Sequence, residues 1–250
     1  MSKRPRNGAI EASSAGVVII GNEILSGRVQ DENLGYICRQ LNERGVPVRQ
    51  AVVIPDDIGT IARAVRSFSE AYDVVITTGG VGPTHDDVTM AGVAGAFRLS
   101  IVRHAELEAG IRTWYGNRTN DAALKMADLP EGAELIQRPG IRFPPVRVGN
   151  VFILPGIPQY LRDKFEAVVD LLKGKPRFGE VLRLSVGETE IADLLEQVER
   201  AVQTVSIGSY PQVNDPECKV VLTLESPSQG DVEDAVEMLR TRLPEGSLLP

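Results

Sequence analysis

The strongest constraint on the fold comes from short segments that contain only aliphatic residues and end in glycine. Val17–Ile20 ends at Gly21, and Val74–Ile76 runs through two threonines into Gly79. Uninterrupted apolar segments of this length are typical of strands that are buried on both faces of a parallel sheet. The pattern therefore favours a central sheet that is covered by helices on both sides.

Segments with helical periodicity separate these strands. Apolar residues recur at i, i+3, i+4 and i+7 from Leu34 to Leu41 and again from Ile58 to Phe68, and a further apolar strand over 46–54 lies between them. Alternating strands and helices indicate βαβ units. Only 5% of the residues are aromatic, so aliphatic side chains must build the core. We predict a three-layer α/β fold with a mostly parallel sheet.

Composition changes divide the chain into three parts. Residues 1–15 are small or polar and are expected to form a flexible tail, and 16–175 are expected to form the α/β domain. The segment 173–179 is rich in glycine, proline and basic residues, which is typical of a domain boundary. Residues 176–250 alternate as strand, helix, two strands and helix, which predicts a small α+β domain with βαββα order.

Charge and composition exclude several classes of protein. The formal net charge is −7, which argues against binding to a nucleic acid backbone through clustered basic residues. No apolar segment approaches the roughly 18 residues of a membrane span, and no secretory signal is recognisable near the start. Two cysteines and two histidines do not make a zinc site of the usual spacing. We expect a cytoplasmic protein without a membrane or nucleic acid partner.

A glycine-rich turn between a strand and a helix is the first candidate site. Thr78, Gly79, Gly80, Gly82 and Thr84 belong to this turn. Backbone N–H groups of such a turn can hold phosphate, with the following helix adding its positive end. The structural alternative is a tight turn that binds nothing. The sequence matches neither the P-loop nor the dinucleotide-binding pattern.

Two adjacent carboxylates, Asp86 and Asp87, follow the glycines. They would repel a phosphate unless a divalent cation stood between them, and Mg²⁺-like ions bind carboxylates and phosphates together. The pair therefore predicts an oxygen-ligated divalent metal ion, with a monovalent cation as an additional candidate. The structural alternative is that Asp86 caps the helix that follows.

A second polar loop, over 21–33, follows the first strand. If the first and third strands are neighbours, Glu23 and Asp31 approach the Asp86–Asp87 loop, and Arg28 meets phosphate. The structural alternative is that Asp31 or Asn33 caps the next helix.

Four motifs together resemble a known family. They are Gly21-Asn22-Glu23-Ile24-Leu25; Asp31-x-Asn33; Thr78-Gly79-Gly80-Val81-Gly82-Pro83-Thr84-x-Asp86-Asp87-x-Thr89; and Leu154-Pro155-Gly156-Ile157-Pro158. Residues 15–175 resemble the molybdopterin-binding-like domain of CinA-type proteins, and the remainder resembles the small domain that follows it in those proteins. Isoleucine at 157 favours the N-terminal half of eukaryotic-type FAD synthases.

The resemblance implies metal-dependent hydrolysis of the pyrophosphate of ADP-ribose-like or FAD-like dinucleotides. It implies metal binding by Asp87 and Asp31 and nucleotide binding around Gly156, with Glu23 or Asp86 as the candidate base. The partners expected are a small nucleotide and further copies of the chain in a homo-oligomer. Two alternatives stay open: a molybdopterin-binding or nucleotidyl-transferring protein of molybdenum cofactor biosynthesis, and a noncatalytic nucleotide-binding module.

Recognition of the nucleotide base is predicted for the small domain. Tyr210 offers an aromatic face on which a purine or flavin could stack, and Lys219 offers a cation. The structural alternative is that Tyr210 is an ordinary core or interface residue beside the end of a strand.

Overall fold

The computed structural model describes residues 9–250, and the chain divides into two compact units between Gly174 and Lys175. This division lies one residue from the boundary expected from composition. Each unit has its own hydrophobic core.

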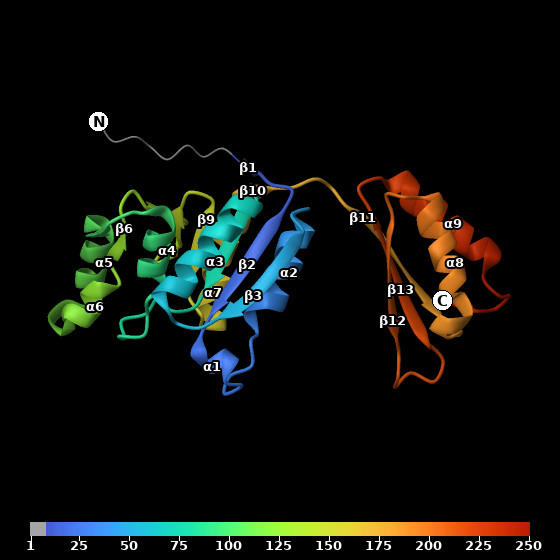
Figure 1. The fold of residues 1–250 in the computed structure, drawn as a ribbon, viewed down its shortest axis with the longest axis horizontal. Helices are drawn as coiled ribbons and strands as arrows, with labels where there is room; N and C mark the ends of the chain where they lie inside the picture. Colours follow the sequence, from blue (N-terminus) through green and yellow to red (C-terminus); the bar gives the residue numbers. More distant parts are fainter. Residues whose placement is uncertain (1–8) are drawn as a thin grey trace. The chain divides into compact units, whose positions relative to one another are not determined.

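The first unit is built on a six-stranded sheet (Figure 1) with the order β3-β2-β4-β9-β8-β7. Four neighbouring strands are parallel: β3 (Val48–Ile54), β2 (Ala15–Ile20), β4 (Val74–Thr78) and β9 (Val151–Leu154). The antiparallel edge consists of β8 (Val146–Val148) and β7 (Glu134–Leu135). The mostly parallel sheet is therefore confirmed, and the turn at Gly149 makes the hairpin between β8 and β9.

Helices cover both faces of this sheet. The helices α2 (Asn33–Glu43) and α7 (Pro158–Val169) pack on one face, whereas α3 (Ile58–Ala71), α4 (Thr89–Phe97) and α5 (Ala105–Tyr115) pack on the other. The strand β2 serves both cores, because Val17 and Ile19 face the first group and Val18 and Ile20 face the second. A strand that contributes side chains to two cores must be apolar on both faces, which requires an uninterrupted apolar sequence. The predicted three-layer fold is confirmed.

Short elements fill the region between α5 and β7, where the sequence gives no clear pattern. They are η1 (Gly116–Arg118), α6 (Asp121–Lys125) and β6 (Asp128–Pro130), and β6 pairs with β5 (Ile101–Arg103). Elements of three to five residues are too short to show a period. Ala127 and Leu129 are nevertheless fully buried, so this region belongs to the core.

The sequence predicts a flexible tail over residues 1–15. This prediction is wrong for residues 9–15, and residues 1–8 lie outside the part of the chain that the structure describes. Ile10–Glu11 (β1) pairs in parallel with Leu172–Lys173 (β10), and Ala12 is buried. The backbone N–H of Ser13 donates to Asp73, 2.8 Å away. Small polar residues can be ordered by such contacts, which composition does not reveal.

The second unit has the expected βαββα order. Its elements are β11 (Phe178–Leu184), α8 (Glu188–Ala201), β12 (Ser206–Pro211), β13 (Val220–Ser226) and α9 (Gln229–Arg242), and a short strand, β14 (Leu248–Leu249), is added at the end. The sheet order is β12-β13-β11-β14, and all pairs are antiparallel. This is the small α+β domain that the sequence predicts.

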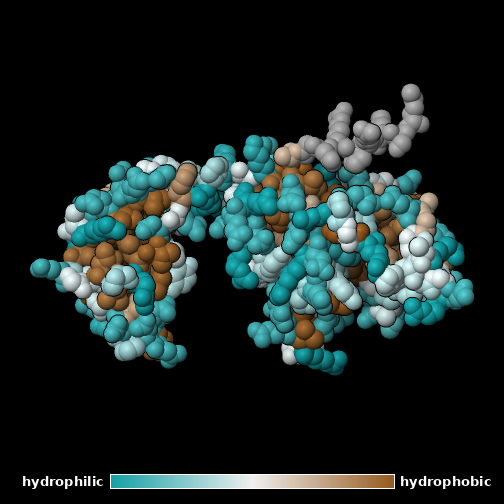
Figure 2. Space-filling model, turned by 180° about the vertical axis from the view of Figure 1, so that it is seen from behind, coloured by the Kyte–Doolittle hydropathy of each residue, from teal (hydrophilic) through white to brown (hydrophobic). Residues whose placement is uncertain are grey.

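The surfaces of both units are mixed in character. Figure 2 shows apolar areas separated by hydrophilic side chains on each unit. Within residues 9–250, no helix has both the length and the apolar character that crossing a membrane requires.

Candidate functional site

The candidate site lies where β2 and β4 end. These strands are parallel neighbours, as the sequence analysis assumed, and the chain passes from β2 to β3 on one side and later to β4 on the other. Ligands of open α/β sheets bind at the carboxyl ends of strands where the connections change direction in this way. The loops after β2 and β4 therefore occupy the expected position for a ligand.

The glycine turn after β4 has a backbone that requires glycine. Gly79 has φ +104° and Gly80 has φ +61°, both in the left-handed region. A Cβ on Gly79 would lie 2.0 Å from the carbonyl oxygen of Ile20, and the Gly79 N–H donates to Leu154 O at 3.1 Å. Close packing against the ends of β2 and β9 thus explains why this position requires glycine, whether or not the turn also binds phosphate.

Asp87 is held in this loop by hydrogen bonds to its Oδ2. That oxygen accepts from the backbone N–H of Thr84 at 2.8 Å and from the Thr84 hydroxyl. The helix α4 begins only at Thr89 and has no side-chain cap, so the reading of Asp86 as its cap is wrong. Lys125, which the sequence analysis missed, donates to the carbonyl oxygens of Thr84 and Asp87 and so holds the loop from α6.

Asp86 lies beside this arrangement and is exposed to solvent. Its side chain is 63% exposed and that of His85 is 99% exposed. Hydrogen bonding, from Thr84 first and then from the Asp86 backbone, lowers the pKa of the Asp86 carboxyl. A lower pKa makes a carboxylate a weaker base, which disfavours Asp86 and leaves Glu23 as the other candidate base.

Asp31 and Asn33 have structural roles at the start of α2. Asp31 Oδ2 accepts the backbone N–H of Leu34 at 2.8 Å, which is the capping alternative of the sequence analysis. Asn33 is buried, and its Nδ2 donates to Gly156 O at 2.7 Å and to Thr78 Oγ1 at 3.2 Å. Asn33 therefore ties together the loops that follow three strands of the sheet.

We expect Asn33→Ala to lower the free energy of unfolding by about 1–3 kcal/mol, because it leaves the buried Thr78 hydroxyl and the Gly156 carbonyl without their donor. Urea denaturation followed by circular dichroism measures this effect. Asn42→Ala, an exposed position of the same helix, is the matched control and should change stability by less than about 0.5 kcal/mol. Equal stability of the two variants would show that the Asn33 contacts are energetically unimportant.

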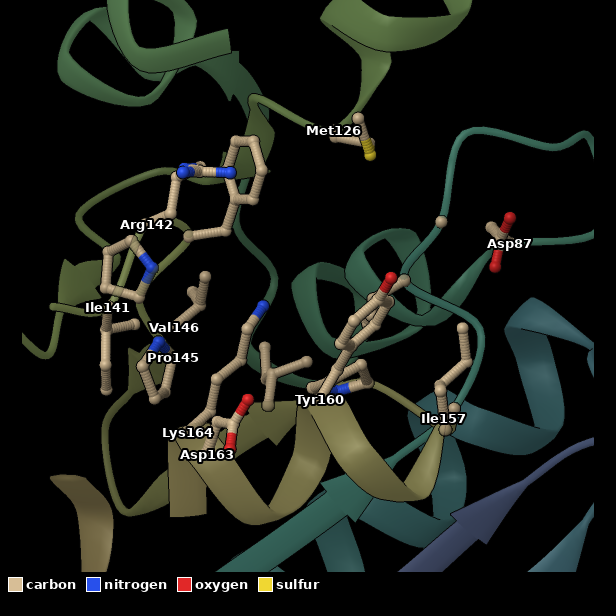
Figure 3. A pocket seen from close by; sticks show the side chains of 18 of the residues that line it. Asp87, Met126, Ile141, Arg142, Pro145, Val146, Ile157, Tyr160, Asp163 and Lys164 are labelled. Carbon is tan, nitrogen blue, oxygen red and sulfur yellow. The ribbon is translucent and has the colours of Figure 1, made fainter. Parts of the chain in front are cut away.

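A cavity of about 1240 Å³ opens beside the glycine turn. Figure 3 shows Asp87 at one side of it, with Tyr160 and Lys164 rising from α7 and Arg142 opposite. Six predicted site residues line the cavity: Glu23, Gly79, Gly80, Gly82, Asp87 and Gly156. Ligand pockets commonly measure about 300–1,000 Å³, so this cavity has room for a dinucleotide.

Other predicted site residues lie outside the cavity lining. In the first unit these are Arg28, Asp31, Asn33, Thr78, Thr84 and Asp86. Tyr210 and Lys219 are exposed residues of the second unit. The structural reading of Tyr210 as a core residue is wrong, because its side chain is 53% exposed.

Several lining residues were missed by sequence reasoning. The Arg142 guanidinium lies over the Trp114 ring at 3.4 Å from its centre, and Tyr160 is 54% exposed. Arg142 and Trp114 come from segments that the sequence does not place together. Lys164 carries a local signal, because it falls three residues after Leu161 and four before Val168, within the apolar stripe of α7.

The carboxylates of the cavity fit a metal ion only in part. Glu23 and Asp87 line the same cavity, but within residues 9–250 no three His, Cys, Asp or Glu side chains form a metal-binding group. Mg²⁺ is often held by one or two carboxylates and completed by substrate phosphates and water. The donors present are compatible with that mode of binding.

Comparisons with known proteins agree with this architecture. Residues 16–174 match the family described as "Probable molybdopterin binding domain", and residues 176–250 match "FAD synthase, middle domain". A protein of Archaeoglobus fulgidus is 35% identical over 198 residues, which are 78% of this chain and 85% of that protein. A "Probable FAD synthase" of Caenorhabditis elegans is 34% identical over 93% of this chain and 50% of its own length. The chain therefore spans about half of that relative.

A solved structure is also similar to the first unit. The protein CinA of Thermoplasma acidophilum, described as having unknown function, is 34% identical and aligns with a TM-score of 0.58 over 63% of this chain and 96% of its own. The chain belongs to the molybdopterin-binding domain family. It combines this domain with an FAD synthase middle domain and has CinA-like and FAD synthase homologues.

Proposed function

We propose that the protein is a divalent-metal-dependent nucleotide pyrophosphatase that hydrolyses ADP-ribose-like or FAD-like dinucleotides. The observation that supports it most is the position of Asp87, on a glycine turn at the end of β4 and in the wall of a cavity of about 1240 Å³. The cavity provides carboxylates at this end and cations and aromatic rings elsewhere in its wall. A dinucleotide needs all three kinds of contact.

The residues of the chain have separate tasks in this proposal. Backbone N–H groups of the glycine turn hold the pyrophosphate, and Asp87 binds the metal ion, with Asp31 as the predicted second ligand. Glu23 takes the proton of a water molecule whose oxygen attacks one phosphorus, the bridging P–O bond breaks, and the other phosphate leaves. A bound divalent ion supplies charge neutralisation on the phosphates and a lower pKa for that water.

Nucleotidyl transfer is the second candidate. The match of residues 16–174 to a molybdopterin-binding domain favours it, because such a domain provides an acceptor site for a pterin. In that case an oxygen of the pterin, and not water, would attack the α-phosphorus of a nucleoside triphosphate, the pterin would receive the nucleotidyl group, and pyrophosphate would leave. A noncatalytic binding module would give neither reaction.

Product analysis separates these candidates. Purified protein is incubated with ADP-ribose, FAD and related dinucleotides, or with ATP and a pterin, each with Mg²⁺, Mn²⁺ or EDTA, and the products are identified by mass spectrometry. We expect two mononucleotide or phosphosugar products from a dinucleotide, formed with a divalent ion and absent with EDTA. An adenylylated pterin would support the second candidate, and no product in any mixture would support a binding module.

A further inference from the structure

Lys164 is a cation in the cavity wall, and no neutralising partner for it lies among residues 9–250. It comes from the middle of α7, and Figure 3 shows its side chain pointing from the helix into the cavity, among Pro145, Val146 and Tyr160. Among residues 9–250, no carboxylate lies within ion-pair distance of its ammonium group and no acceptor is hydrogen-bonded to it. Lys164 is half-buried, and a cation that loses part of its hydration normally has such a partner, because desolvation of an unpaired charge is unfavourable.

Other cations near the cavity differ in this respect. Arg138 is paired with Glu166 at 2.8 Å and with Asp170 at 3.6 Å. Lys125 is bound to two backbone carbonyl groups. Arg142 has no carboxylate partner in the described part of the chain, and its guanidinium group lies over the Trp114 ring. The cavity wall therefore contains two cations, Lys164 and Arg142, whose charges the described residues leave uncompensated.

Burial lowers the pKa of the Lys164 ammonium to about 8. The other charged or titratable groups of the cavity wall are Asp163 and Glu166 on the same helix, Tyr160 also on that helix, Arg138 and Arg142 in the loop before β8, Tyr115 on α5, and Glu23 and Asp87 at the glycine turn. Burial is the cause of the shift, and none of these groups forms an ion pair or a hydrogen bond with the Lys164 ammonium in the part of the chain that the structure describes. At neutral pH the group is still mostly protonated and can bind an anion.

We propose that the ammonium group of Lys164 is an anion-binding site for a phosphate group of the nucleotide substrate. An ammonium group offers three donors and a compact charge, which suits a phosphate oxygen. Arg142 adds a second uncompensated charge in the same cavity, which favours a multiply charged anion over a neutral group. The proposal rests on the proposed function for the identity of the substrate, and it makes Lys164 a specificity-determining residue.

Direct binding tests this assignment without turnover. ADP and adenosine are titrated into the full chain by calorimetry at pH 7 with EDTA, so that no metal contributes to affinity. Loss of a charge-assisted hydrogen bond in Lys164→Met should weaken ADP binding by at least about tenfold and leave adenosine binding unchanged. Lys164→Arg, which keeps the charge, should retain ADP affinity within about threefold. Lys173 is an exposed lysine outside the cavity. The Lys173→Met variant is therefore the matched control and should bind ADP and adenosine as the wild-type protein does.

The pH dependence of ADP binding gives a second readout. Bound phosphate stabilises the protonated amine, so its pKa is higher in the complex than in the free protein. The affinity of the wild-type protein for ADP should therefore fall as the pH rises above about 8, whereas the affinity of Lys164→Arg for ADP should not fall in that range.

Thermal stability separates a binding role from a structural one. Below pH 8 the unpaired ammonium destabilises the fold, so Lys164→Met should melt a few degrees higher at pH 7. The difference in melting temperature should shrink between pH 8 and pH 10.5. In this range Lys164 of the wild-type protein is protonated in the unfolded state and deprotonated in the folded state, so the wild-type protein gains stability as the pH rises.

The proposal is overturned if folded Lys164→Met binds ADP as tightly as the wild-type protein does, or if the wild-type protein does not bind ADP. Lysine-dependent binding of ADP without hydrolysis of any dinucleotide would overturn the proposed function alone.

Discussion

Replacement of Asp87 by asparagine is expected to lower turnover of the preferred dinucleotide by at least about 10²-fold, which corresponds to several kcal/mol of metal-assisted stabilisation. The fold should survive, because the carbonyl oxygen of asparagine can accept the hydrogen bonds from Thr84 that Oδ2 now accepts. What is lost is the negative charge that faces the cavity. Steady-state kinetics at saturating Mg²⁺ measure the effect, and circular dichroism reports the fold.

Asp86→Asn is the matched control for this experiment. It removes the same charge from the neighbouring residue, which is exposed and outside the cavity lining. We expect less than about a threefold change in turnover, in keeping with a small surface electrostatic effect. Near-normal activity of a folded Asp87→Asn variant, or equal losses in both variants, would remove Asp87 from its proposed role.

Gly79→Ala is expected to destabilise the protein by at least about 3 kcal/mol, or to prevent folding. The added Cβ would lie 2.0 Å from a backbone oxygen of β2, which cannot move without disturbing the sheet, and the residue has φ +104°. Overpacking and backbone strain each carry a penalty of about 1–3 kcal/mol. The midpoint of urea denaturation measures the change.

Gly110→Ala provides the control for Gly79→Ala. Gly110 lies in α5 and a Cβ there meets nothing within 4 Å, so the substitution should be neutral or stabilise by up to about 1 kcal/mol. If both variants unfolded at the same urea concentration, the close packing of the glycine turn against β2 would be contradicted.

The sheet and the site loops were predictable because local patterns specify them. A strand buried on both faces must be apolar throughout, and Val17–Ile20 shows this directly. The alternation of strands and helices predicted that the strands are parallel. The structure shows that β2 and β4 are neighbours, which the sequence alone left as a condition, and their adjacency brings the loops with Glu23 and Asp87 to one end of the sheet. Glycines at the turn indicated an unusual backbone, and the positive φ angles of Gly79 and Gly80 confirm it.

The rest of the site depends on contacts between distant segments. The cavity wall joins α5, α7 and the loop before β8, so Trp114 and Arg142 meet only after the chain has folded. Asp31 is equally suited to capping a helix and to binding metal, and its spacing from Leu34 shows only that the cap is possible. The ordering of Ile10 and Glu11 likewise depends on pairing with β10, more than 150 residues away.

The central claim is that water attacks a dinucleotide pyrophosphate in the cavity beside Asp87. The most direct test is to run the reaction with Mg²⁺ in water enriched in oxygen-18 and to determine the label in each product by mass spectrometry. The account predicts one labelled oxygen in the phosphate of one product, no label in the other, and no reaction with EDTA or with Asp87→Asn. Products without label, or turnover that survives both EDTA and Asp87→Asn, would contradict it.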